Sequence, residues 1–404
     1  MPDVNGNNRP VVLIYAEPLL ARSMTFIRTQ AEALTRLSAY YIGPQYLRDG
    51  LPLPQDRVLV MHDGNGSLSK LKELPFKALG YAPGFVRRLR SLQPSLLHAH
   101  FGPMGLRALP LAQRLDIPLV VTFQGYDATM HDEYARVSQY YSHRVYRRRR
   151  KELENGAALI IAVSNFIRDE LVKQGFAREQ IAVHYVGVDT ELFRPDPAVQ
   201  RQEIVLFTGR LAEKKGCEYL IRAMAKLQPA FPQFELVIVG DGPLRSELER
   251  LAAQTLSRYR FLGFQPPEVV KSWMNRARVF AAPSIRARSG DAEGYPNAYA
   301  EAQSMALPVV SFNADGVREA VQDGTTGFLA PERDVDGLAH KLECLLASEN
   351  LCRRMGQAAR EYVCTHFNLR IQTTKLEQLY ASVLRARGGS PLADTPVEER
   401  LVGM

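Results

Sequence analysis

Two cationic side chains stand in a segment of the sequence that is suited to a polyanionic ligand. Arg210 and Lys215 lie five residues apart in FTGRLAEKKG, directly after an apolar run. An arginine binds phosphate oxygens as a planar fork, and a lysine binds them as a point charge. Two such cations at one turn fit a diphosphate, and they also fit an ordinary charged surface loop, so this motif needs support from others.

A second segment, GDAEGYPNAYAEAQSM, contains the carboxylates Glu293 and Glu301. Pro296 is well placed to open a helix that reaches about position 306, and the free N–H groups at such a helix start attract anions. Gly294 permits close approach of the backbone to a ligand. Two carboxylates about two turns apart, on either side of an anion site, suit a diphosphate flanked by hydroxyl groups, which is the pattern of a sugar nucleotide.

Two further motifs are interpreted as structural. VGDGPLR, Val239–Arg245, lacks the third glycine of a dinucleotide fingerprint and predicts a tight turn at the edge of a crevice. Asp334 and Asp336 begin a predicted helix, where capping explains them better than magnesium binding does. The four cysteines form neither a CxxC pair nor a Cys/His cluster. We therefore predict no metal site.

The elements that would position these residues are strands alternating with helices. Strands that are apolar on both faces and separated by helices predict parallel sheets covered on both sides. Two series of such runs each indicate a doubly wound α/β domain with Rossmann-like topology. The runs are Val11–Ala16, Leu96–Phe101, Pro118–Phe123, Ala158–Ser164 and Ile181–Val188, followed by Ile204–Gly209, Glu235–Gly240, Arg260–Phe264, Val279–Pro283 and Pro308–Phe312.

A chain of 404 residues is long enough for two domains. The aperiodic stretch FRPDPAVQ, Phe193–Gln200, separates the two series. We predict an N-terminal domain over residues 1–195, a C-terminal domain over 196–368, a helix over 369–387 and a flexible tail over 388–404. Two doubly wound domains that face each other form one crevice, lined by the loops at the carboxyl ends of their strands.

The charge of the chain is basic and uneven. The net charge is +8, and residues 1–200 hold 25 Lys and Arg against 19 Asp and Glu. The segment Arg136–Lys151 alone has seven basic residues and no acidic one. The overlapping stretch YYSHRVYRRRRKELE, Tyr140–Glu154, predicts a helix and is open to three interpretations, namely a solvated helix face, a contact with anionic lipid or an acceptor diphosphate, and nucleic-acid binding. Nucleic acid is the least favoured, because aromatic-rich RNA motifs and zinc modules are absent from the sequence.

Targeting signals are not apparent in the sequence. Residues 1–10 lack the basic and then apolar order of a signal peptide, and the longest apolar runs have the length of a strand. We therefore expect a cytoplasmic protein. Any contact that it makes with the inner face of the cell membrane would be peripheral.

Taken together, the motifs resemble glycosyltransferase family 4. Glu293 and Glu301, with seven residues between them, look like the paired-glutamate motif of that family, and GRLAEKKG, VGDGPLR and FLGF are similar to it in order and spacing. The similarity extends to SMTFI, HAHFG, TFQGYD and GVDTELFRP and covers residues 10–385. The resemblance implies the two-domain GT-B fold, retention of anomeric configuration, metal-independent chemistry and a C-terminal helix that crosses back to the first domain.

The resemblance also implies roles for individual residues. Arg210 and Lys215 would hold the donor diphosphate and neutralise the leaving group, and Glu293 would accept a hydrogen bond from a hydroxyl of the transferred sugar. Glu301 would accept from the ribose. The remaining candidate donor contacts are Gly263, Phe264, Gly294, Tyr295, Pro296 and Asn297. The candidate acceptor or membrane contacts are His100, Arg147, Arg148, Arg149 and Arg150.

The sequence departs from the family pattern at Gln124, where many members have histidine. An amide donates and accepts hydrogen bonds but cannot become cationic. Gln124 and Asp127 remain candidate donor contacts. His100, at the end of a predicted strand, is open to two interpretations, a ligand contact and a hydrogen bond that packs the loop.

We therefore predict a retaining hexosyltransferase that uses GDP-mannose or a UDP-hexose. The acceptor would be polyprenyl-linked or an oligosaccharide, in the synthesis of a cell-envelope polysaccharide such as an exopolysaccharide or O-antigen. The nucleotide sugar is a substrate, and no cofactor is predicted. The alternatives are a phosphorylase, a sugar-nucleotide epimerase and a degenerate GT-B protein that acts as a non-catalytic partner subunit. Gln124 favours the last of these, and the set of two cations and two glutamates opposes it.

Overall fold

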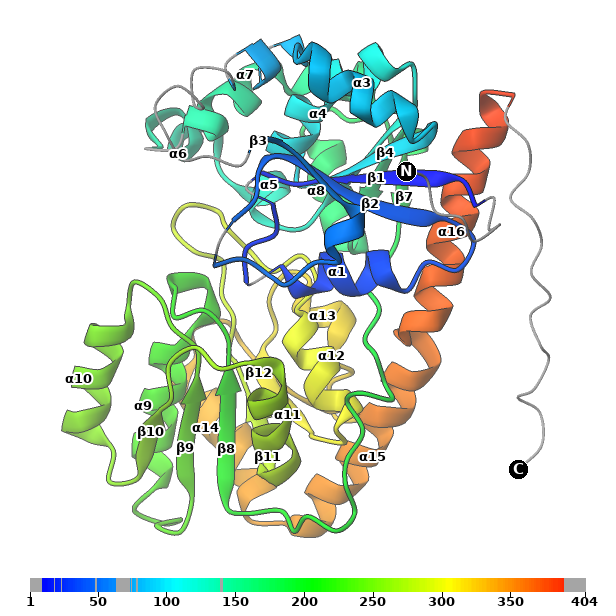
Figure 1. Ribbon diagram of the computed structural model, residues 1–404. Coiled ribbons are helices and arrows are strands. Elements are labelled where there is room, and N and C mark those ends of the chain that lie inside the picture. The colour runs from blue at the N-terminus through cyan, green and yellow to red at the C-terminus, as the bar shows by residue number, and fades with distance from the viewer. Residues whose placement is uncertain are drawn as a thin grey trace.

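The computed structural model describes residues 9–388 except positions 18, 23, 48, 63–72, 74, 78, 139 and 140. This part of the chain forms two α/β units that lie one above the other in Figure 1, with the N-terminal unit in blue to green at the top. The lower unit runs from green to orange. A long helix, drawn in red, follows one side of the molecule from the lower unit to the upper one.

The N-terminal unit is built on a parallel sheet with the strand order β3-β2-β1-β4-β5-β6-β7. The order reverses between β1 and β4, which is the topological switch point where ligands bind in such sheets. The strands are β1 Val11–Tyr15, β2 Ser38–Gln45, β3 Val58–His62, β4 Pro94–His100, β5 Leu119–Phe123, β6 Leu159–Ala162 and β7 Ile181–Val183. The helices around it are α1 Thr25–Glu32, η1 Gln55–Arg57, α3 Pro83–Ser91, α4 Gly102–Leu115, α5 Tyr126–Thr129, α6 Asp132–Val137, α7 Tyr141–Gly156, α8 Asn165–Lys173 and η2 Arg178–Gln180.

The C-terminal unit is built on a second parallel sheet with the order β10-β9-β8-β11-β12-β13. Its strands are β8 Ile204–Thr208, β9 Glu235–Val239, β10 Tyr259–Phe261, β11 Val279–Ala281, β12 Val309–Phe312 and β13 Gly327–Ala330. Its helices are η3 Glu213–Lys215, α9 Cys217–Leu227, α10 Arg245–Thr255, α11 Pro267–Arg276, α12 Asn297–Ser304, α13 Val317–Ala320, α14 Val335–Leu346 and α15 Glu349–His366.

The predicted fold class is confirmed, and all ten predicted strands are present. The prediction missed β2, β3 and β13. Gly43 and Pro44 in β2 resemble a turn signal, but a Cβ at Gly43 would lie 2.5 Å from the carbonyl oxygen of Ala16. The first residue of β13, Gly327, is equally close to its neighbour, since a Cβ there would lie 2.0 Å from the carbonyl oxygen of Val309. Close approach of the backbone thus requires glycine inside these strands.

Helix α16, Leu369–Ala386, carries the chain back to the N-terminal unit (Figure 1). The Glu377 carboxylate accepts hydrogen bonds from the backbone N–H groups of Thr35 and Arg36, at 2.7 and 2.6 Å. The Tyr380 hydroxyl lies 2.6 Å from His98 Nδ1. The predicted domain boundaries stay predictions, and the predicted tail beyond Gly388 lies outside the described residues.

A second contact joins the two units beside the crevice. The Glu319 carboxylate accepts hydrogen bonds from the N–H groups of Asn165 and Phe166 at 2.9 and 2.8 Å and from the Tyr185 hydroxyl at 2.6 Å. It therefore caps the positive N-terminus of α8 from the opposite unit. Arg286, which pairs with Asp315 at 2.7 Å, adds a cation–π contact to Phe166.

Ala306 is a strained position behind α12. Its φ of 55° lies in the left-handed region, which disfavours any residue with a Cβ by roughly 1–2 kcal/mol. We expect Ala306→Gly to raise the free energy of unfolding by about 0.5–1 kcal/mol in urea titrations. Ala253→Gly, at an exposed position inside α10, should lower it by about 1 kcal/mol. A loss of stability in Ala306→Gly would show that the methyl group contributes more by packing than the backbone loses by strain.

Candidate active site

The loop that follows β8 brings both predicted cations to the carboxyl edge of the second sheet. The Lys215 Nζ lies 2.5 Å from Glu293 Oε1 at the end of the β11–α12 loop. Gly216 makes this approach possible, since its φ is +61° and a Cβ there would lie 1.8 Å from the carbonyl oxygen of Pro283. Arg210 is exposed, and its guanidinium has no partner within the described chain.

Glu293 is a buried, ionised carboxylate. Its side chain is 7% exposed, and the Ser284 hydroxyl donates to Oε1 at 3.3 Å. Burial by itself raises the pKa of Glu293, but the ammonium groups of Lys215 and Lys214 outweigh that effect and lower the pKa below its ordinary value. Lys214 also pairs with Asp291 at 2.9 Å. The structure thus joins two of the predicted residues in one buried ion pair.

The start of α12 offers unpaired backbone donors. The N–H groups of Gly294, Tyr295 and Asn297 form no hydrogen bond within the described chain. Pro296 is the N-cap residue, as the sequence led us to expect within one position, and the helix ends at Ser304. Together with the dipole of the helix, these donors form a site for an anion.

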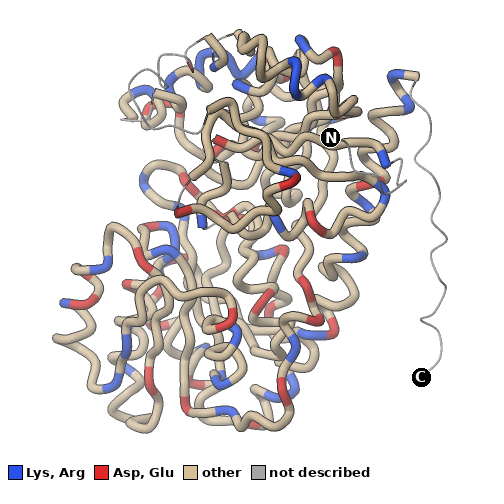
Figure 2. Tube along the Cα trace, viewed as in Figure 1, with Lys and Arg blue, Asp and Glu red and all other residues tan. Residues whose placement is uncertain are grey.

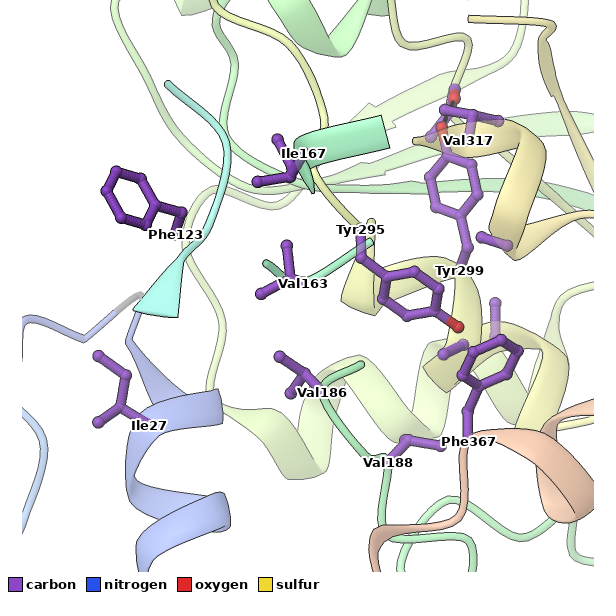
Figure 3. Packing of buried hydrophobic residues seen from close by; sticks show 14 of the residues in the cluster. Ile27, Phe123, Val163, Ile167, Val186, Val188, Tyr295, Tyr299, Val317 and Phe367 are labelled. Atoms are coloured by element: carbon purple, nitrogen blue, oxygen red, sulfur yellow. Dashed lines mark hydrogen bonds between the residues drawn. The ribbon is translucent and has the colours of Figure 1, made fainter. Parts of the chain in front are cut away.

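Two residues near this helix also make packing contacts that the sequence did not predict. A Cβ at Gly294 would lie 2.0 Å from the carbonyl oxygen of Gln124, so the glycine permits contact with the other unit as well as with a ligand. The Tyr295 ring turns toward Phe367, at a centroid distance of 5.0 Å (Figure 3). It also packs against Tyr185, at a centroid distance of 5.4 Å. The side chain of Tyr295 is therefore a packing residue, which leaves its N–H group as the possible donor contact.

Glu301 lies inside α12 with partial exposure, and no described residue donates a hydrogen bond to its carboxylate. Burial raises its pKa to about 7. A hydrogen bond from a ligand hydroxyl would stabilise the ionised form of this carboxylate and so lower its pKa. This environment agrees with the ribose contact that the family resemblance implies.

Asp127 organises the wall that the N-terminal unit contributes to the crevice. Its carboxylate accepts hydrogen bonds from the backbone N–H groups of Gly102 at 2.9 Å, Gln124 at 3.1 Å and Gly125 at 2.8 Å. Burial raises the pKa of Asp127 to about 6, and these N–H groups limit the rise. With both oxygens occupied, Asp127 positions the loop that carries Gln124, so the geometry does not favour the direct donor contact that was predicted.

His100 lies behind that wall. It is 1% exposed, and its Nδ1 is 3.2 Å from Nε2 of Gln124. Burial, with His184 nearby, lowers the pKa of His100 to about 3. The structure thus contains the loop-packing hydrogen bond that was one of the two interpretations of this residue.

The other edge of the crevice is formed after β10. Gly263 has a φ of +67°, and its carbonyl oxygen accepts from the N–H of Gly240 at 2.8 Å. Phe264 is 51% exposed, and the Arg22 guanidinium of the N-terminal unit lies 5.8 Å from its ring centroid. The turn at Gly240 is structural, as predicted, because a Cβ there would lie 1.9 Å from the carbonyl oxygen of Gly209.

Comparison with known proteins decides the family. The model of Glycosyltransferase Family 4 matches residues 27–192, and that of Glycosyl transferases group 1 matches residues 188–362. The putative colanic acid biosynthesis glycosyltransferase WcaL of Escherichia coli is 32% identical over 289 residues, which cover 70% of this chain and 69% of WcaL. The chain belongs to glycosyltransferase family 4.

Other relatives and a solved structure agree with this assignment. The amylovoran biosynthesis glycosyltransferase AmsK of Erwinia amylovora is 33% identical over 225 residues, 55% of each chain. A GDP-mannose-dependent alpha-(1-6)-phosphatidylinositol monomannoside mannosyltransferase of Mycolicibacterium smegmatis is 30% identical over 251 residues, 59% of this chain and 65% of that one. The crystal structure of Anabaena Alr3699/HepE in complex with UDP and glucose superposes with a TM-score of 0.72 at 20% identity, over 93% of this chain and 100% of that one. This likeness supports the GT-B fold.

The arginines of α7 do not act as one group in this glycosyltransferase. Arg149 pairs with Glu152 at 2.7 Å, and Arg150 pairs with Asp132 at 3.0 Å. Arg147 and Arg148 have no ion-pair partner within the described chain. The four were predicted together from their adjacency, but consecutive residues of a helix point in different directions.

The sequence analysis missed Lys214, Ser284 and Tyr299. Ser284 joins the Glu293 carboxylate to the Tyr299 hydroxyl, which lies 3.0 Å from the Ser284 hydroxyl. The doubled lysine in EKKG signalled a second cation. No local signal marks Ser284 and Tyr299, because the fold brings them to Glu293 from the loop after β11 and from α12. Asp334 accepts from the N–H of Gly337 at 2.9 Å and so caps α14, as predicted.

Arg210 and Lys215, the two cations of the loop after β8, should contribute differently to the stability of the fold. Lys215→Met leaves the Glu293 carboxylate buried beside Lys214 alone and should lower the free energy of unfolding by roughly 2–4 kcal/mol. Arg210→Ala removes an exposed, unpaired side chain and should change it by less than about 0.5 kcal/mol. The double variant Lys215→Met with Glu293→Gln should recover most of the loss in urea titrations. Equal stability of all three variants would contradict the buried ion pair.

Glu301 should make the stability of the glycosyltransferase depend on pH. Its folded-state pKa, about 7, lies above the ordinary value of 4.5, so ionisation of this group opposes folding as pH rises through that window. Glu301→Gln should therefore raise the Tm by roughly 2 °C at pH 8 and by progressively less toward pH 5. Glu268→Gln, at an exposed site on α11, should show no such trend. A Tm difference for Glu301→Gln that is constant with pH would contradict this account.

Proposed function

We propose that this glycosyltransferase moves a hexose from GDP-mannose or a UDP-hexose to a polyprenyl-linked or oligosaccharide acceptor, with retention of anomeric configuration, in envelope polysaccharide synthesis. The observation that carries the proposal is the ion pair of Lys215 and Glu293 beside the unpaired N–H groups at the start of α12. The N–H groups that could bind a phosphate begin at Gly294, directly after the Glu293 carboxylate, which could accept a hydrogen bond from a hydroxyl group.

The chemistry that this arrangement supports is departure of a nucleoside diphosphate. Arg210 and Lys215 can stabilise the charge that develops on the leaving oxygen, and such contacts are worth roughly 3 kcal/mol each. Glu293, held ionised by its two lysines, can accept from a hydroxyl of the transferred sugar. The reaction needs no cofactor or metal in this proposal, since the two side-chain cations take the role of the electrophile.

Retention is supported by the poor bases on the opposite wall. An inverting transferase needs a general base that deprotonates the acceptor. Asp127 is occupied by three backbone N–H groups, and His100 has a pKa of about 3. In transfer on the same face of the sugar, the departing diphosphate can itself take the proton of the acceptor.

The relatives support the choice of substrates. WcaL and AmsK are named for colanic acid and amylovoran biosynthesis, and the mycobacterial relative is named for GDP-mannose. The HepE structure contains UDP. A non-catalytic partner subunit is the alternative, and Gln124 is the observation in its favour.

A donor panel tests the proposal. The purified protein is incubated with GDP-mannose, UDP-glucose, UDP-galactose and their free nucleoside diphosphates, and release of GDP or UDP is measured with EDTA present. We expect release from at least one sugar nucleotide, and a roughly hundredfold lower kcat in Arg210→Ala. Loss of release in EDTA with recovery in Mg²⁺ would overturn the metal-independent mechanism. Binding without release or transfer, with every acceptor offered, would favour the partner subunit.

We further propose that the glycosyltransferase sits on an anionic membrane through the corner between α6 and α7. Tyr134, Val137 and Tyr141 are exposed there by 50, 74 and 69%, and α7 also carries Arg147 and Arg148, which have no ion-pair partner among the described residues. Figure 2 shows Lys and Arg gathered along the upper helices of the N-terminal unit. No helix in the described part of the chain is long and apolar enough to cross a membrane. Aromatic side chains flanked by cations suit the interface of a bilayer.

Membrane docking predicts that the arginines of α7 contribute unequally. Replacing Arg147 and Arg148 by Gln should weaken binding to phosphatidylglycerol vesicles by about 1 kcal/mol per charge, and binding should fall as salt rises. Replacing the ion-paired Arg149 and Arg150 should have a smaller effect. Slow hydrolysis of the sugar nucleotide in free solution should stay unchanged in the first variant. Equal vesicle binding by all variants would leave α7 as a solvated helix face.

A further inference from the structure

We propose that His100 is a positioning residue that fixes the side-chain amide of Gln124, so that Oε1 of Gln124 accepts a hydrogen bond from a hydroxyl of the transferred sugar. This inference rests on the proposed function and deepens it, because it names a determinant of which sugar the donor carries. It concerns a place where the chain departs from the family pattern.

The backbone of Gln124 is held beside the donor loop. Its N–H donates to Asp127 Oδ1 at 3.1 Å, and its carbonyl oxygen lies so near Gly294 that a Cβ there would be 2.0 Å away. Gly294 directly follows Glu293, the predicted contact of the transferred sugar. The amide of Gln124 therefore starts from a fixed point next to the place of the sugar.

The tautomer of His100 follows from the amide nitrogen that faces it. Nε2 of Gln124 lies 3.2 Å from Nδ1 of His100, and an amide nitrogen can only donate. Nδ1 of His100 must therefore accept, which places the proton of the neutral ring on Nε2. Burial of the ring, which is 1% exposed, keeps it neutral near pH 7.

The His100 ring is itself packed between two other rings. The ring of His98 lies at a centroid distance of 4.3 Å, and that of Phe26 approaches edge-on at 6.3 Å. His98 is fixed in turn by the Thr122 hydroxyl at 2.7 Å and the Tyr380 hydroxyl at 2.6 Å. The side chain of Gln124 is thus anchored, through two histidines, to the helix that joins the two units.

The anchored amide leaves one acceptor for a ligand. Within the described chain no group bonds to Oε1 of Gln124, and the side chain of Gln124 is partly exposed. The His100 ring is 1% exposed, so it acts through Gln124 and not on the ligand itself. A sugar hydroxyl can donate to this oxygen, whereas a deoxy position leaves the oxygen unpartnered and is disfavoured.

The test compares binding of the sugar nucleotide with binding of the free nucleoside diphosphate, which lacks the sugar. Both affinities are measured by calorimetry for the full chain and for His100→Leu, His100→Asn, Gln124→Ala and the double variant His100→Leu with Gln124→Ala. His340→Leu, at an exposed site on α14, is the matched control. Binding is measured with the sugar nucleotide of the donor panel that has the highest affinity in calorimetry, so the result does not depend on turnover.

We expect His100→Leu and Gln124→Ala each to weaken binding of the sugar nucleotide by roughly tenfold and binding of the nucleoside diphosphate by less than twofold. The double variant should lose no more affinity for the sugar nucleotide than the weaker-binding single variant, because the two substitutions remove the same contact. His100→Asn, which keeps an acceptor oxygen, should recover most of the loss. Unchanged sugar-nucleotide affinity in folded His100→Leu would overturn the inference, as would equal loss for both ligands, which a merely structural role predicts. Failure of the proposed function would instead appear as sugar-nucleotide binding without transfer.

Discussion

The buried carboxylate of Glu293 is the constraint on which the construction of the donor loops depends. A charge that is 7% exposed is unstable without a partner, so the loop after β8 must reach the start of α12 and deliver Lys215. Gly216 permits the required turn against Pro283, and Lys214 supplies a second positive charge. Within the described part of the chain, Arg210 has no partner and the N–H groups of Gly294, Tyr295 and Asn297 form no hydrogen bond. Charge neutralisation in the core and anion binding at the surface are therefore consequences of one arrangement.

The second wall of the crevice depends on another buried carboxylate, Asp127. It gathers the N–H groups of Gly102, Gln124 and Gly125, which belong to the loops after β4 and β5. Because the carbonyl oxygen of Gln124 packs against Gly294, the position of this wall also sets the distance between the two units. The loops after β5 and β11 thus meet through a backbone contact, and Glu319 and α16 also join the two units.

Some candidate site residues lie where the sequence led us to expect them, because the signals that mark their loops are local. Arg210, Lys215 and Glu293 stand in loops between recognisable strands and helices, and parallel topology brings such loops to one edge. Tyr295 and Asp127 show where that reasoning fails. Each stands in a motif beside a ligand site, but their side chains have buried partners, Phe367 for Tyr295 and three backbone N–H groups for Asp127. A motif gives proximity to a ligand, and the direction of each side chain depends on packing.

The sequence by itself determined the parallel α/β architecture and the loops that carry the charged residues. These features follow from hydrophobic periodicity and from residue types at strand ends, which are local properties of the chain. The tertiary structure alone decided which charges are neutralised and which stay free: Lys215 is paired and Arg210 is open, Arg149 is paired and Arg148 is open. It also explains the glycines inside β2 and β13, where another backbone lies too close for a Cβ atom, and it turns the amide of Gln124 toward His100. Such pairings join residues far apart in the chain, and no local pattern can specify them because their energy depends on burial and distance.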